Sequence, residues 1–146
     1  MAIDRGRFLT RFAIALSDRL FRHPWAELSP AECVVVLVDR VEREVNNGGF
    51  HQFYFNSAGD CATETPAALR AIGAYQVAAV VEQANALFPG GAPPVDRSER
   101  QRVLDEIDPD ITIFNEFDRR FYAYPDDVLT LVYEFVVARR DQIRGA

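Results

Sequence analysis

The chain contains no lysine, so all sixteen of its basic residues are arginines. No apolar run approaches the ~20 residues that a membrane-spanning helix needs. Cysteine is scarce: Cys33 and Cys61 lie far apart in the sequence, which favours two reduced thiols over a disulfide and predicts a cytoplasmic protein. The N-terminal segment carries Asp4, Arg11 and Asp18 among its apolar positions, so it resembles neither a signal peptide nor a transit peptide.

The sequence also lacks the motifs of common enzymes. It has no glycine-rich phosphate loop after a strand, no serine nucleophile motif and no cysteine pair at metal-binding spacing. His23 has no nearby polar partner and suits a surface position, which leaves His51 as the other histidine. The adjacent acids Asp126 and Asp127 do not face each other on a helix, so they make a poor general acid and base pair. The sequence therefore predicts no catalytic residue, no metal ligand and no cofactor.

Acidic residues are concentrated in one part of the chain. Residues 1–50 hold seven acids and seven arginines, so the whole net charge of −6 lies in residues 51–146, where fifteen acids face nine arginines. The segment 105–127 alone has eight acids and two arginines, a difference that again equals six. No basic patch is visible in the sequence, and direct contact with nucleic acid is therefore not expected.

The chain is organised around the stretch 42–56, in which two glycines separate an apolar helix from an aromatic one. Glycine readily adopts the positive φ angle that ends a helix, and here two glycines follow two asparagines. Phe50, Phe53 and Tyr54 then recur at i, i+3 and i+4, which places them on one helical face. This pattern predicts a helix-turn-helix corner that anchors the core, with a structural role for its residues. These residues are Glu44, Asn47, Gly48, Gly49, Phe50, Gln52 and Asn56.

Helical spacing and capping signals recur along the chain. Ser29 and Pro30 with Glu32 form a capping box ahead of an apolar helix, and Asp96 with Glu99 begins another helix in the same way. β-branched residues dominate positions 34–45, but the length and the charged face favour a helix over a strand. The sequence predicts an all-α fold, with residues 1–146 as a single domain of six to seven helices. The expected helices cover residues 4–20, 30–45, 50–56, 65–87, 96–107, 114–121 and 125–144.

Three segments leave room for other interpretations. Gly73 lies inside the expected 65–87 helix, and because glycine there costs about 1 kcal/mol relative to alanine, it predicts close packing at that point. The run 89–94 is rich in proline and glycine. Only about fifty residues follow it, so a surface loop within one domain is favoured over a domain linker. Residues 111–114 are compatible with either an extended segment or the beginning of a helix.

The pattern Glu-x-x-Asn-Gly-Gly-Phe-x-Gln in the 42–56 stretch resembles the signature of a bacterial family named after a DNA-mimic protein. The similarity covers roughly residues 28–137, which would form the family-like core after an N-terminal helix in 1–27. It continues in the segments 71–74, 88–96 and 118–122. The signature is specific for membership of the family and not for an activity, and the lack of catalytic motifs predicts a non-enzymatic protein. In the best-known member, an acidic surface occupies the DNA-binding site of a transcription factor.

The predicted function is therefore that of an acidic module whose partner is another protein, such as a DNA-binding regulator. The alternatives are an immunity- or antitoxin-type inhibitor of a protein effector, a small-molecule site at Glu44, His51 and Asn56, and an acidic surface that only keeps the protein in solution. A monomer and a homodimer are both open, and no membrane partner is expected. The predicted partner-binding acids are Asp60, Glu64, Asp105, Glu106, Asp108, Asp110, Glu116, Asp118, Asp126 and Asp127.

Overall fold

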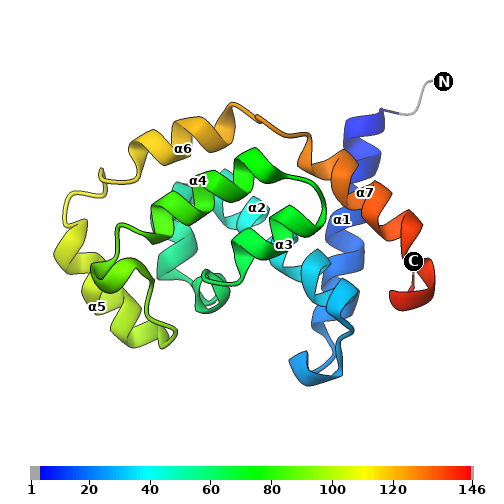
Figure 1. Ribbon diagram of the computed structural model, residues 1–146, viewed down its shortest axis with the longest axis horizontal. Helices are drawn as coiled ribbons and strands as arrows, with labels where there is room; N and C mark the ends of the chain where they lie inside the picture. The colour runs from blue at the N-terminus through cyan, green and yellow to red at the C-terminus, as the bar shows by residue number, and fades with distance from the viewer. Residues whose placement is uncertain (1–3, 146) are drawn as a thin grey trace.

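The computed structural model describes residues 4–145, and this part of the chain forms α-helices and short 3-10 turns without a β-strand (Figure 1). The all-α prediction is confirmed. No helix in this range is long and apolar enough to cross a membrane. The α-helices are α1 (Arg5–Phe21), α2 (Pro30–Phe55), α3 (Thr65–Ala71), α4 (Tyr75–Asn85), α5 (Arg97–Ile107), α6 (Asn115–Tyr122) and α7 (Val128–Ala138). The 3-10 turns are η1 (Trp25–Glu27), η2 (Ser57–Cys61), η3 (Pro89–Gly91) and η4 (Arg140–Gln142).

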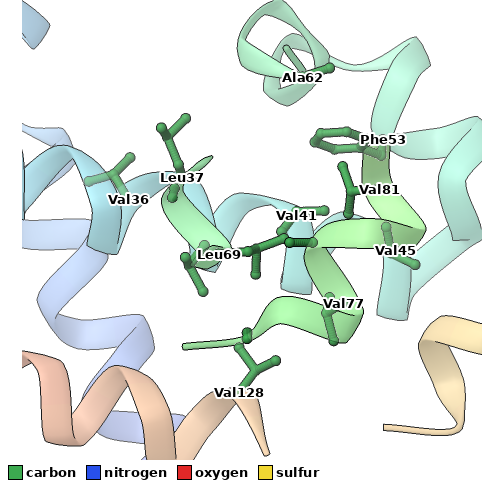
Figure 2. Packing of buried hydrophobic residues seen from close by; sticks show 14 of the residues in the cluster. Val36, Leu37, Val41, Val45, Phe53, Ala62, Leu69, Val77, Val81 and Val128 are labelled. Carbon is green, nitrogen blue, oxygen red and sulfur yellow. The ribbon is translucent and has the colours of Figure 1, made fainter. Parts of the chain in front are cut away.

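Helix α2 is the centre of the packing. It contacts α1, α3, α5, α6 and α7, while α4 packs on α3 and α6. In Figure 1, α1 and α7 lie at one end of the molecule and α5 lies at the other, with α3 and α4 between them and α6 alongside α4. Val41, Val45 and Phe53 of α2 are fully buried, and Figure 2 shows them beside Leu69 of α3 and Val81 of α4. These apolar side chains form one continuous core.

The capping box predicted ahead of α2 is confirmed. The backbone N–H of Glu32 donates to Ser29 Oγ at 3.1 Å, and the backbone N–H of Ser29 donates to Glu32 Oε1 at 2.8 Å. Residues 34–45 are helical, so the strand considered for them does not form. At α5 only half of the predicted capping box forms. Asp96 accepts a hydrogen bond from the backbone N–H of Glu99 at 2.9 Å, but the Glu99 carboxylate bonds to Arg102 and not back to Asp96.

The Gly–Gly corner is a kink inside α2, so the predicted aromatic helix over 50–56 is the last part of α2. Gly49 has φ +74° and ψ −176°, a conformation that is almost confined to glycine. Phe50, Phe53 and Tyr54 are each 0% exposed, as their spacing predicted. The ring of Phe50 packs edge to face on Phe121 of α6 with 5.8 Å between centroids. The kink therefore turns an aromatic cluster onto α6.

The helix predicted over 65–87 is broken at Gly73 into α3 and α4, and the close packing expected there is wrong. Gly73 has φ +90°, and a Cβ built on it would meet nothing nearer than Leu131 Cδ2 at 3.8 Å. Glycine is needed because the backbone that ends α3 is left-handed. Helix α4 then starts afresh: the N–H groups of Gln76 and Val77 donate to Asp126 Oδ2 at 2.8 and 2.9 Å.

The last helix is shorter than predicted. Helix α7 begins at Val128 and not at 125, because Asp127 accepts hydrogen bonds from Thr130 N at 3.2 Å and Thr130 Oγ1 at 2.7 Å and so caps it. It ends at Ala138, and η4 follows.

The run 89–94 is a loop within the fold, as favoured. Phe88 before it and Pro93 inside it are buried, and α5 after it packs on α2. Residues 111–114 form a turn that leads into α6 without an extended strand.

Candidate functional site

A buried carboxylate holds the turn between α5 and α6. Asp108 is 2% exposed, and its Oδ1 accepts hydrogen bonds from the backbone N–H groups of Thr112 and Ile113 at 2.7 and 3.0 Å. Its Oδ2 lies 2.8 Å from His51 Nδ1. Burial by itself raises the pKa of Asp108, but the two N–H donors and His51 lower it more, so its pKa lies below the ordinary value. Asp108 is therefore ionised and fixes the path of the turn.

The same turn exposes an apolar residue in a strained conformation. Ile111 has φ +55°, which a β-branched residue rarely adopts, and its side chain is 60% exposed. Asp110 next to it is exposed, as are Asp105 and Glu106 near the end of α5. Asp105, Glu106, Asp110 and Ile111 are called the 105–111 surface below.

Half of the predicted partner-binding acids are bound within the protein. Asp108 fixes the turn, and Asp126 and Asp127 cap helices as described above. Asp118 accepts a hydrogen bond from the backbone N–H of Phe50 at 2.8 Å, and burial raises its pKa. The fifth such residue, Asp60, lies 2.8 Å from the guanidinium of a buried arginine. These five carboxylates stabilise the fold, a role that was not predicted for Asp60, Asp108 and Asp118.

The other five acids are exposed. Glu106 pairs with Arg102 at 2.7 Å on α5, and Glu116 pairs with Arg119 on α6. Such exposed pairs contribute little to stability, but the arginines offset the negative charge. Within residues 4–145 no hydrogen bond or ion pair engages the carboxylates of Glu64, Asp105 and Asp110. The free negative surface is therefore smaller than the number of acids in the sequence suggests.

Glu44 joins the two halves of the Gly–Gly corner. Its Oε2 accepts hydrogen bonds from Gln52 Nε2 at 2.8 Å and from Asn56 Nδ2 at 3.0 Å. The kink also requires a small residue, because a Cβ on Gly48 would lie 2.0 Å from Gln52 Oε1. Asn47 is exposed at the kink. These contacts support the structural role predicted for the corner.

The three residues considered for a small-molecule site belong to two separate networks. His51 bonds to Asp108 and stacks on Phe55 with 6.3 Å between ring centroids. Glu44 and Asn56 bond to each other instead. No hydrogen bond within residues 4–145 links the two networks, so the structure gives this hypothesis no shared set of contacts.

Arg100 has a fully buried side chain, and no role was predicted for it from the sequence. One signal was present, because Arg100, Val103, Leu104 and Ile107 recur at i, i+3, i+4 and i+7 on the buried face of α5. The guanidinium donates five hydrogen bonds that join the end of α2, η2 and the segment before α5. The acceptors are Tyr54 O at 2.6 Å, Pro94 O and Val95 O at 3.0 Å, Asn56 O at 2.9 Å and Asp60 Oδ1 at 2.8 Å.

The carboxyl group of Glu42 on α2 also has an unusual environment that was not predicted. Burial raises the pKa of Glu42 to about 7, and the negative charges of Asp39 and Asp127 raise it too. A hydrogen bond from Asn46 Nδ2 to Glu42 Oε2, 2.7 Å long, only partly offsets this effect. No arginine forms an ion pair with Glu42 within residues 4–145.

Glu42→Gln is expected to stabilise the protein above neutral pH. From the ordinary pKa of 4.5 up to the folded-state pKa of about 7, the folded protein keeps a proton that the unfolded chain releases. The free energy of unfolding therefore falls as pH rises through this window and stays low above it. Glutamine copies the protonated form and does not titrate. Above pH 7 the free energy of unfolding of the variant should exceed that of the wild type by up to about 3 kcal/mol, since each unit of pKa shift corresponds to about 1.36 kcal/mol. Below about pH 4.5 the two proteins should be almost equally stable.

Urea unfolding of both proteins across this pH range measures the effect. Glu134→Gln on the exposed surface of α7 is the matched control and should follow the wild type at every pH. If the curves of wild type and Glu42→Gln run parallel from acid to alkaline pH, Glu42 does not titrate in the way that its burial implies.

Among the described residues, no group of three His, Cys, Asp or Glu side chains could hold a metal ion.

A known protein family matches most of this chain. Neither the curated proteins nor the solved structures give a match. The model of the DMP19-like protein family matches residues 26–139, which include the kinked helix α2, the Arg100 network and the 105–111 surface. Since this match covers most of the chain, the protein belongs to the DMP19-like protein family, which is named after a DNA-mimic protein.

Proposed function

We propose that this protein is a non-enzymatic binding module that occupies the nucleic-acid-binding site of another protein and so acts as a DNA mimic. Membership of the DMP19-like family and the net charge of −6 support this function. The observation that carries it is the 105–111 surface. Its acids Asp105 and Asp110 are exposed and have no arginine partner within residues 4–145.

Charge density limits how much DNA this surface imitates. Duplex DNA carries one negative charge per ~1.7 Å of helix axis. The acids of segment 105–127 do not follow one helix, because α5 ends at Ile107 and α6 begins at Asn115. The 105–111 surface offers three carboxylates, and Arg102 offsets one of them. The surface therefore matches a short run of phosphates on one strand, and a homodimer would present it twice.

Neutralising this surface is expected to weaken partner binding roughly tenfold. The variant is Asp105→Asn/Glu106→Gln/Asp110→Asn, and each exposed charge contributes about 0.2–1 kcal/mol at such a site. The partner is obtained by affinity capture from the native cell extract and identified by mass spectrometry. Binding of the purified partner is then titrated at low and physiological ionic strength, with duplex DNA as competitor. We expect DNA to compete, and the wild type to lose affinity as salt rises because steering is screened.

The control removes equal charge elsewhere. Glu27, Glu134 and Asp141 are exposed acids outside the 105–111 surface, so Glu27→Gln/Glu134→Gln/Asp141→Asn changes the net charge by the same amount. It should bind the partner almost as the wild type does. Equal losses in both triple variants would mean that only net charge matters. Affinity that is insensitive to salt and to duplex DNA would contradict the proposed mechanism.

The exposed Ile111 favours a second candidate function, an immunity- or antitoxin-type inhibitor that uses a mixed apolar and acidic surface. DNA phosphates offer nothing that corresponds to an apolar anchor, whereas a protein effector offers pockets for one. Binding that survives high salt, does not respond to duplex DNA and is abolished by Ile111→Ser would support this second function over DNA mimicry.

A further inference from the structure

A cleft between α1, α2 and the segment that follows α6 lies outside the 105–111 surface. It has a volume of about 490 Å³, which is within the range of small-molecule sites. Ile14 of α1, Tyr124 of the α6–α7 segment and Leu129 of α7 supply its apolar wall. Glu42 and Asn46 of α2 supply polar groups.

A second, much smaller pocket of about 20 Å³ adjoins this cleft. Both are lined by Ala13, Asp39, Glu42 and Leu129, so the two carboxyl groups lie where the outer cleft meets the apolar interior. The remaining residues of the small pocket are valines and it has almost no polar lining other than these acids. The cleft thus combines an apolar wall with acids at its inner end.

The polar groups of the cleft leave one oxygen without a partner. Tyr124 Oη donates to Asn46 Oδ1 at 3.0 Å, and Asn46 Nδ2 donates to Glu42 Oε2 at 2.7 Å. Glu42 Oε1 is buried and accepts no hydrogen bond from any residue in 4–145. Tyr124 is itself held at φ +49°, an uncommon conformation for a residue other than glycine.

The charges around Glu42 are predominantly negative. On α2, Arg43 is already engaged by Asp39 at 2.7 Å and by Asp18 of α1 at 3.0 Å. From the α6–α7 segment, Asp127 adds a negative charge and Tyr124 a neutral phenol. The residues of α1 that line the cleft are Thr10, Ala13 and Ile14, none of which is charged. A buried acid without a counter-ion is unfavourable, and a bound cation would supply one.

We propose that this cleft binds an alkylguanidinium or alkylammonium group, with the cationic head on Glu42 and the alkyl stem against Ile14, Tyr124 and Leu129. Long basic chains bind in this way, because their apolar stems cover apolar surface while their heads pair with carboxylates. The site is separate from the 105–111 surface, so it can be tested without the protein partner.

The pairing makes binding depend on pH. Below the raised pKa of Glu42, about 7, the carboxyl is protonated in the free protein and a cation must displace that proton to form the ion pair. The affinity for a cation therefore rises as pH increases through neutrality. Burial raises the pKa of Asp39 too, although its hydrogen bonds from Arg43 lower it in part. Glu42, with its pKa of about 7, is therefore the carboxyl whose ionisation governs the change near neutrality.

Calorimetric titration of the full chain with three probes tests the proposal. These probes are butylguanidinium, arginine blocked at both ends as a peptide residue, and the equally blocked neutral citrulline. We expect saturable binding of the cations and none of citrulline. The affinity should be several-fold higher about one unit above pH 7 than about one unit below it, because the carboxylate fraction changes accordingly. Tighter binding of blocked arginine points to a side chain of another protein, and tighter binding of butylguanidinium points to a free small molecule.

Glu42→Gln keeps the shape of the side chain and should lose the binding of both cations at every pH, while Glu64→Gln, an exposed acid of another region, should retain it. Thermal unfolding of each variant checks that it is folded. The proposal is overturned if citrulline binds as well as arginine, if no probe saturates, or if folded Glu42→Gln binds the cations as the wild type does.

Discussion

Arg100→Met is expected to lower the free energy of unfolding by about 3–5 kcal/mol. Removing one partner of a buried ionic network leaves the others buried and unpaired, and losses of about this size result. Here four backbone carbonyls and Asp60 would lose a donor together. Methionine fills much of the space of the arginine stem and leaves little cavity. The decrease in the free energy of unfolding therefore measures mainly the lost hydrogen bonds. Urea unfolding of both proteins measures the change.

Arg100→Lys separates charge from geometry. Lysine keeps the positive charge but cannot reach five acceptors with one ammonium group, so it should lose most of the same stability. Arg97→Met is the surface control on the same helix and should change the free energy of unfolding by less than about 1 kcal/mol. A stable Arg100→Met protein would mean that the buried guanidinium does not hold α2, η2 and the segment before α5 together.

Gly49→Ala is expected to destabilise the protein by about 3 kcal/mol or more. A Cβ on Gly49 would lie 2.6 Å from Asp118 Oδ2, and the φ of +74° with ψ of −176° is a conformation that alanine avoids. Moving Asp118 away would break its hydrogen bond from the backbone N–H of Phe50. Because this bond ties the kink to α6, the loss should appear as lower cooperativity as well as a lower midpoint in chemical unfolding.

Gly90→Ala is a control for a positive φ angle without a steric clash, although its ψ differs from that of Gly49. Gly90 has φ +79° and ψ 0°, and a Cβ there would meet nothing within 4 Å, so only the left-handed conformation is penalised, by about 1–2 kcal/mol. The combined change Gly49→Ala/Asp118→Ala removes the clash but also the hydrogen bond. If Gly49→Ala loses no more stability than Gly90→Ala, the close approach of Asp118 is not what requires glycine at the kink.

The helices were predicted well where all the residues of a capping motif or of a helical spacing lie close together in the sequence. Ser29 and Glu32 form a capping box within four residues, and Phe50, Phe53 and Tyr54 lie on one face by spacing alone. The prediction failed at Gly73, because a glycine in a helical pattern is compatible with two structures. It can be tolerated inside a continuous helix, or it can end the helix by adopting a left-handed backbone conformation. Nothing near it in sequence decides between them: the donors of the next helix are capped by Asp126, fifty residues away from Gln76.

The candidate site was predicted less completely than the fold. Asp105 and Asp110 lie exposed on the 105–111 surface, as a partner-binding role requires, but Asp108 between them is buried. The three residues look alike in the sequence. Their burial differs because His51, on another helix, reaches Asp108 and the chain turns around that contact.

The sequence by itself determined the all-α fold, the kink at the two glycines and the excess of negative charge. Helical periodicity, caps and composition depend on residues that are neighbours along the chain, so they are readable before folding. Only the tertiary structure decided which carboxylates remain free, that Arg100 is buried and that Glu42 is half-buried with one oxygen inaccessible. A charge's partners and its contact with water depend on elements far away in sequence, and burial then determines whether it stabilises the fold, shifts its pKa or faces a partner.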